Sequence, residues 1–292
     1  MPRDLHWCFF IQLWIAWGAF GIFLDDTPPC GLPHISPVSR RIIGGKEARV
    51  DSWPWMALMA KDKQTACGGS VLNKRLILTA VHCFANSIPT ESPSAWTVYL
   101  GKHHVTTRDS SERSFNIQTY VPHPDFNNDT LENDIAIIML DRDIEFSDAI
   151  LPICIPPSAN HVVPTGTYCY VTGWGESRGT GDRNVLNQAS VPILHNYWCS
   201  RQDWYGNKFF WKVTFCAGFK SGTRDACTGD SGGPLACKAK NGRWYVQGVT
   251  SWGFDCGQEN WPGIYTDVSV YAAWIRHTAL SLGIPILNDD SL

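Results

Sequence analysis

Eleven cysteines are spread along this chain of 292 residues, from Cys8 to Cys256. No two of them have the Cys-x-x-Cys spacing of a zinc knuckle, so we expect no metal site. Scattered cysteines that follow an apolar N-terminal segment favour disulfides formed in an oxidising compartment. Many short apolar runs separated by turn residues lie between them, a pattern typical of an all-β domain.

The N-terminal segment is an apolar run over residues 7–24 that precedes two aspartates. Small residues at Ala19 and Gly21 offer a signal-peptidase site, so we predict a signal peptide over residues 1–21 and a secreted protein. The alternative is a membrane-anchored protein that keeps the run as a signal anchor, because about 18 apolar residues are borderline for crossing a bilayer. Residues 284–292 are interpreted as a short C-terminal tail. The formal net charge of -3 gives no reason to expect nucleic acid as a partner.

A serine surrounded by glycine and acid stands in the stretch DACTGDSGGP, residues 225–234. Glycines tolerate backbone angles that turn consecutive N–H groups to one side. The N–H groups of Gly229 and Ser231 would then hold the oxygen that becomes negative when Ser231 attacks a carbonyl. The alternative for such a composition is an ordinary turn.

Three segments together carry a resemblance to a known family. The stretch around Ser231 resembles the nucleophile loop of the chymotrypsin/trypsin family of serine proteases, and LTAVHC at residues 78–83 resembles its histidine segment, with Val81 in place of an alanine. Asp134 opens an apolar run, and the order His82, Asp134, Ser231 is the chymotrypsin order. The resemblance implies that Ser231 is the nucleophile, His82 its general base, and Asp134 the group that orients His82.

The resemblance extends over residues 42–283, which we take as the protease domain. It implies an all-β fold of two six-stranded antiparallel β-barrels with a C-terminal α-helix, and catalytic groups at the junction of the barrels. It also implies a hydrolase that needs no cofactor. For the C-terminal helix we expect residues 270–282, with Val270, Ala273, Trp274 and Leu280 on its apolar face.

An activation site precedes the domain. Residues 22–41 read as an extended pro-segment that ends in Arg41, and Ile42 begins an Ile-Ile-Gly-Gly start like that of the family. A cut after Arg41 would free the Ile42 amine to pair with Asp230 beside the nucleophile, which would order the loop. The alternative is a surface dibasic site before a flexible turn.

The disulfide pairing that the family implies uses ten of the cysteines. Cys30 would tie the pro-segment to the domain, as in two-chain members, and Cys8 is left over in the leader. The implied pairs are Cys30–Cys154, Cys67–Cys83, Cys169–Cys237, Cys199–Cys216 and Cys227–Cys256.

Asp225 stands six residues before Ser231, where the family places the base of the pocket for the residue before the cut. A carboxylate there selects arginine or lysine. Ala226 lacks the extra oxygen that would help a shorter lysine, so we predict arginine over lysine. The resemblance assigns the other pocket residues as Ser251, Trp252, Gly253 and Gly263.

Two surface regions leave alternatives open. The long loop over residues 84–99 either walls the cleft or is a tolerated insertion. The aromatic residues between Tyr197 and Phe215 either pack as a helix-loop over the second barrel or form a wall for the N-terminal side of a substrate. Asn128 begins a glycosylation sequon, as expected of a glycoprotein.

A third region, the loop at residues 102–112, begins with Lys102, which argues against a calcium site there. We interpret His103 and His104 as exposed loop residues.

These observations predict a secreted serine endopeptidase made as a zymogen. Its partners would be protein or peptide substrates with arginine or lysine at the cut, protein protease inhibitors, and an activating trypsin-like protease or the chain itself. The alternatives are a catalytically silent binding protein on the same fold and a membrane-anchored protease.

Overall fold

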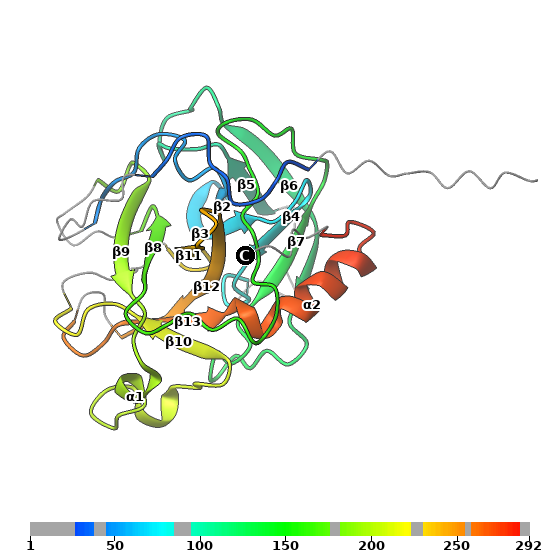
Figure 1. The fold of residues 1–292 in the computed structure, drawn as a ribbon. Helices are drawn as coiled ribbons and strands as arrows, with labels where there is room; N and C mark the ends of the chain where they lie inside the picture. Colours follow the sequence, from blue (N-terminus) through cyan, green and yellow to red (C-terminus); the bar gives the residue numbers. More distant parts are fainter. Residues whose placement is uncertain are drawn as a thin grey trace, which may run out of the picture.

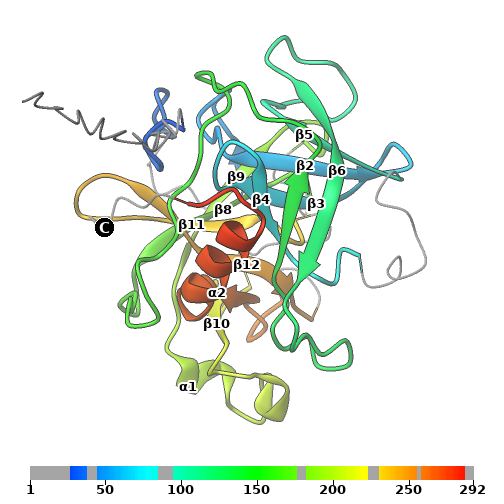
Figure 2. The ribbon, with the colours of Figure 1, turned by 90° about the vertical axis from the view of Figure 1, so that its right-hand side faces the viewer.

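The computed structural model describes residues 27–37, 45–84, 95–175, 182–222, 230–254 and 258–286. Apart from the two-residue strand β1 (Lys46–Glu47), its strands form two groups that follow one another along the chain, light blue to green and then yellow-green to orange in Figure 1. Figure 2 shows the same ribbon turned by 90°.

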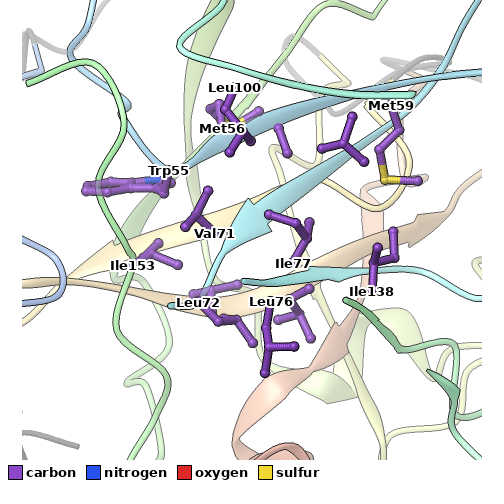
Figure 3. Packing of buried hydrophobic residues seen from close by; sticks show 14 of the residues in the cluster. Trp55, Met56, Met59, Val71, Leu72, Leu76, Ile77, Leu100, Ile138 and Ile153 are labelled. Atoms are coloured by element: carbon purple, nitrogen blue, oxygen red, sulfur yellow. The ribbon is translucent and has the colours of Figure 1, made fainter. Parts of the chain in front are cut away.

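The first group is a closed barrel with the strand order β2-β3-β4-β7-β6-β5. Its interior is filled by aliphatic side chains such as Val71, Leu76, Ile77 and Ile138 (Figure 3), each stabilising the fold by about 1.5–3 kcal/mol when fully buried. The strands are β2 (Met56–Lys61), β3 (Gln64–Val71), β4 (Leu76–Thr79), β5 (Trp96–Leu100), β6 (Arg113–Pro122) and β7 (Ala136–Leu140).

The second group is a sheet with the order β1-β9-β8-β11-β12-β13-β10. An antiparallel bridge between Ile193 and Ala217 joins the end of β9 to the end of β10, so the six longer strands close on themselves. The short β1 lies outside as an edge on β9. The predicted pair of six-stranded barrels is therefore confirmed. The strands are β1 (Lys46–Glu47), β8 (Tyr168–Gly173), β9 (Asn187–Pro192), β10 (Thr214–Ala217), β11 (Pro234–Lys238), β12 (Trp244–Trp252) and β13 (Gly263–Asp267).

The C-terminal helix α2 (Val268–Ser281) confirms the predicted element but not its predicted face. Asp267 caps its start by accepting a hydrogen bond from the Ser269 backbone N–H. Val270 and Leu280, expected to be buried, are 37% and 64% exposed, whereas Tyr271 and Ile275 face the core. Helix α2 contacts β12 (Figure 2). No helix in the described part of the chain is long and apolar enough to cross a membrane.

Four of the five predicted disulfides are present. They are Cys30–Cys154, Cys67–Cys83, Cys169–Cys237 and Cys199–Cys216. Cys227, Cys256 and Cys8 lie outside the described residues.

The segment before the protease domain is held by more than its disulfide. The Gly31 N–H donates to the Pro152 carbonyl at 2.8 Å, and the Trp244 N–H donates to the Gly31 carbonyl at 2.8 Å. Gly31 has a φ of 70°, and a Cβ added there would lie 2.2 Å from the Trp244 carbonyl oxygen. Glycine is therefore required where this segment crosses β12.

The loop after β5 contains a buried ion pair. Lys102 Nζ lies 2.6 Å from Glu112 Oε2, and the two side chains are only 6% and 10% exposed. The expectation of exposed histidines was wrong for His103, which is buried and contacts Glu47 Oε1 at 2.9 Å. His104 is half-buried and contacts Asp109 Oδ1 at 2.7 Å. Two adjacent polar residues look like a surface loop in sequence, but distant segments such as Glu47 of β1 and Trp174 contact one of them.

Candidate active site

The first barrel brings His82 and Asp134 together through strand pairing. Strands β4 and β7 are antiparallel, and Thr79 lies opposite Ala136. His82 follows Thr79 by three residues and Asp134 precedes Ala136 by two. Because residues beyond the end of one antiparallel strand face those before the start of its partner, the two side chains meet at one end of the barrel.

The contact between them is a fully buried carboxylate that holds an imidazole. Asp134 is 0% exposed; its Oδ1 accepts from the His82 backbone N–H at 2.9 Å, and its Oδ2 lies 2.7 Å from His82 Nδ1. Because a carboxylate only accepts hydrogen bonds, Nδ1 carries the hydrogen and Nε2 has a free lone pair. Burial lowers the pKa of His82, but the charge of Asp134 and its hydrogen bond raise this pKa by more, so it lies above its ordinary value.

The second barrel also binds Asp134. Ser251 Oγ, near the end of β12, donates to Asp134 Oδ2, and Thr266 Oγ1 on β13 donates to the Asp134 carbonyl at 2.9 Å. Asn133, with a φ of 58°, accepts from the Tyr271 hydroxyl of α2 at 2.7 Å. A carboxylate buried without hydrogen-bond donors would be costly, so the donors from His82 and Ser251 compensate for the burial of Asp134 between the barrels.

Ser231 lies against the first barrel, where its own glycine-containing segment crosses the segment of Gly68. The Gly68 N–H donates to the Ser231 carbonyl at 2.7 Å, and Cys83 Sγ, next to His82 in the chain, is 3.8 Å from the same oxygen. Gly232 has a φ of 77°, and a Cβ there would lie 2.3 Å from Thr79 Oγ1. Only residues without side chains permit this approach, which sets Ser231 beside the His82 segment.

Asp230 occupies a hollow beside Ser231. Its Oδ1 accepts from the Gly175 N–H at 2.9 Å, and a Cβ added at Gly173 would lie 2.0 Å from that oxygen. Ile42 and Arg41, the other predicted activation residues, lie outside the described residues, as do Asp225, Ala226 and Gly229.

The described residues of the predicted pocket lie together. Trp252 on β12 pairs with Ile264, next to Gly263 on β13. A Cβ added at Gly253 would lie 4.0 Å from Gly263 Cα, with otherwise open space around it apart from Tyr205 Oη at 3.8 Å. Two glycines facing one another leave a gap that larger side chains would fill.

An aromatic group extends from this pocket, and we call Trp252, Tyr205, Phe254 and Trp261 the aromatic shelf. The Tyr205 ring meets the Trp252 ring edge-on at 5.0 Å and stacks on the Phe254 ring at 5.7 Å. The Trp261 ring meets the rings of Tyr205 and Phe254 at 4.9 Å each. Sequence reasoning missed Phe254 and Trp261, although Phe254 continues the Ser251–Gly253 segment by one residue.

The packing interpretation of the residues between Tyr197 and Phe215 is confirmed, whereas the wall for a substrate stays a prediction. Trp204, Tyr205 and Phe209 are buried around the helix α1 (Asn196–Cys199) and the 3-10 helix η2 (Gly206–Lys208), as packing predicts. Tyr205 also joins the shelf beside the predicted pocket.

Cys67, His82 and Cys83 also come close enough together to resemble a metal site. The two sulfurs form a disulfide, however, so neither is a thiolate that could bind a metal.

Two closed barrels, with a buried carboxylate orienting a histidine at their junction and a serine loop against it, define a protein of the serine-protease class. The family model described as Trypsin matches residues 42–275. The chain belongs to this trypsin family of chymotrypsin-like serine proteases.

Proposed function

We propose that the protein is a secreted serine endopeptidase, made as a zymogen, that cleaves after arginine in preference to lysine. The observation that carries this proposal is the buried Asp134, whose carboxylate binds His82 Nδ1, together with the Ser231 carbonyl 3.8 Å from Sγ of Cys83, the residue after His82. A silent binding protein would not need a fully buried carboxylate bound to a histidine, because burying such a group is costly.

In the proposed mechanism, Ser231 Oγ attacks the substrate carbonyl and gives its proton to His82 Nε2. The N–H groups of Gly229 and Ser231 stabilise the oxygen that becomes negative, and each such donor contributes about 2.7–4 kcal/mol. The imidazolium that forms is stabilised by Asp134. His82 then protonates the leaving amine, and water hydrolyses the acyl-enzyme by the same steps in reverse. The residues themselves supply every proton transfer.

Specificity would come from Asp225 at the base of the pocket between Gly253 and Gly263. A guanidinium reaches a carboxylate through two hydrogen bonds, and Ala226 offers no oxygen to a shorter ammonium. Matched peptides that differ only in arginine or lysine before the cut test this preference. Equal kcat/KM for the two peptides would contradict it.

Activation would follow a cut after Arg41. The hollow formed by Gly173 and Gly175 holds Asp230 next to Ser231, where a new Ile42 ammonium would pair with it. The activating enzyme would be another trypsin-like protease or the chain itself, and protein protease inhibitors would bind the same cleft.

Labelling with a fluorophosphonate probe tests the enzyme proposal. The chain is treated with a trypsin-like protease to cut after Arg41, and the probe is then added. We expect labelling of the cut protein but not of its Ser231→Ala variant, nor of an Arg41→Gln chain treated in the same way. A cut protein that takes no label would support the silent binding protein instead.

Mass spectrometry of the mature N-terminus tests secretion. A chain recovered from the medium that begins near residue 22 supports a cleaved signal peptide. A chain that keeps residues 1–21 and requires detergent for recovery would identify a membrane-anchored protease.

A further inference from the structure

A lysine side chain lies at the Phe254 end of the aromatic shelf. Lys208, at the end of η2, places Nζ 4.8 Å from the centroid of the Phe254 ring, a cation–π contact. Because Tyr205 precedes η2 and stacks on the same ring, the lysine is held near the shelf by its own short segment.

This ammonium forms no salt bridge with an acid in the described part of the chain. Lys208 is exposed, and none of the salt bridges among the described residues includes it. Asp203, the acid in the same loop, is already bound to Arg201, whose Nη2 lies 2.6 Å from Asp203 Oδ2. Among the described residues, Lys208 therefore has no acidic side chain in salt-bridge contact.

An extended substrate would reach this lysine from the pocket. Strand β11 begins at Pro234 and pairs with β12 only as far as Val249, so the edge of Ser251–Gly253 is open to strand addition. A chain that pairs there with its cut residue beside Ser231 runs toward Phe254. Side chains three or four residues before the cut would then lie over the shelf.

We propose that Lys208 selects an acidic side chain three or four residues before the cut. This inference rests on the proposed protease function and adds a second, charge-based requirement to arginine at the cut. The pair would be partly exposed, and exposed pairs usually change a rate constant by about twofold to fivefold. The apolar shelf reduces water around one side of the pair, which favours the upper part of that range.

Fluorogenic tetrapeptides with arginine at the cut test the inference. Each of the third and fourth positions is varied between Glu and Gln, and kcat/KM is measured for the full chain after the cut at Arg41. We expect a ratio of Glu to Gln of about twofold to fivefold at one of these positions. The ratio should fall toward one in Lys208→Met, drop below one in Lys208→Glu, and shrink in 1 M salt, where charges are screened beyond about 3 Å.

Lys212→Met is the matched control. Lys212 is also exposed and lies over a tryptophan, with Nζ 5.9 Å from the Trp211 ring centroid, but it lines a separate hollow of about 490 Å³ beside Asp267 and Val270. Its variant should keep the acidic preference. Cleavage of all peptides with the same ratio in the wild type and in Lys208→Met would overturn the inference and leave the protease function intact. Failure to cleave any of them would overturn both.

Discussion

At the scale of single residues, two opposing effects act on the pKa of His82. Burial disfavours its charged form, and the buried charge of Asp134, 2.7 Å from Nδ1, favours it more. The same contact fixes which nitrogen has the free lone pair. One carboxylate therefore determines both the basicity and the direction of the imidazole.

This balance sets the pH dependence of cleavage. A base must lose its proton to act, and the pKa of His82 is raised, so activity should increase with pH and reach half its maximum above the ordinary value of 6.5. In Asp134→Asn, burial still lowers the pKa of His82, but the compensating charge is gone. The pH of half-maximal activity should therefore move below that of the wild type. Activity should fall by about 10⁴-fold because the wrong nitrogen is favoured as the acceptor.

The measurement is kcat/KM against pH for the cut protein with an arginine peptide. An identical midpoint in the wild type and in Asp134→Asn would show that the carboxylate does not control the base.

At the scale of elements, the loop after β5 depends on the pair between Lys102 and Glu112. Both side chains are almost fully covered, and Lys102 also donates to the Thr107 carbonyl at 3.2 Å, which closes the loop on itself. The positive charge at the centre of this loop therefore comes from the Lys102 side chain.

Lys102→Met should destabilise the protein, because it leaves Glu112 buried without its partner. Loss of one member of a buried pair typically costs about 3–5 kcal/mol. Urea unfolding in a Ser231→Ala background, which prevents self-digestion, measures the change. Removing both charges in Lys102→Met/Glu112→Leu should recover most of the loss.

Calcium provides a second readout for this loop. The urea midpoint of the protein with Lys102 intact should be the same with EDTA as with added calcium. Stabilisation by calcium would mean that the ion pair opens to admit the metal.

Several elements could be predicted from sequence because their signals are local. The run before His82 and the run after Asp134 became β4 and β7. The face of α2 could not be predicted in the same way. Its buried side includes Tyr271 and Thr278, whose polar groups conceal the apolar stripe, and the neighbouring barrel decides which side is covered.

At the scale of the whole molecule, the site depends on how closely the barrels approach. A Cβ at Gly68 would lie 3.0 Å from Gly233 Cα, and Gly232 meets Thr79 across the same crossing. The sequence names the serine, histidine and aspartate, since each stands in a distinctive segment. It does not reveal this crossing, because nothing local to Gly68 marks its partner some 160 residues away.

Gly232→Ala should separate the barrels at the site. The added methyl would collide with Thr79 Oγ1, and a displacement of about 1 Å can reduce a rate by about a hundredfold. We expect such a loss of kcat/KM in the cut protein.

Gly242→Ala is the control for backbone strain alone. Gly242 has a φ of 88° but nothing within 4 Å of an added Cβ, so its variant should lose only about 1 kcal/mol of stability and keep its activity. Equal activity of the two variants would mean that the crossing does not position Ser231.

The Cys30–Cys154 disulfide makes a prediction about the cut protein. After cleavage at Arg41, gel electrophoresis without reductant should show one band, and reductant should release the N-terminal piece. In Cys30→Ser/Cys154→Ser only hydrogen bonds such as Gly31 to Pro152 remain, and the piece should separate under denaturing conditions without reductant. Two bands from the unreduced wild type would contradict the tether.

The same disulfide would also determine where the activated enzyme is located. After the proposed cut at Arg41, the N-terminal piece would stay bonded to Cys154, so whatever that piece is attached to would travel with the cut enzyme. If the leader is removed, the activated protease diffuses away with a short passenger peptide. If the leader is kept in a bilayer, maturation switches the enzyme on without setting it loose, and its substrates are confined to what reaches the cell surface.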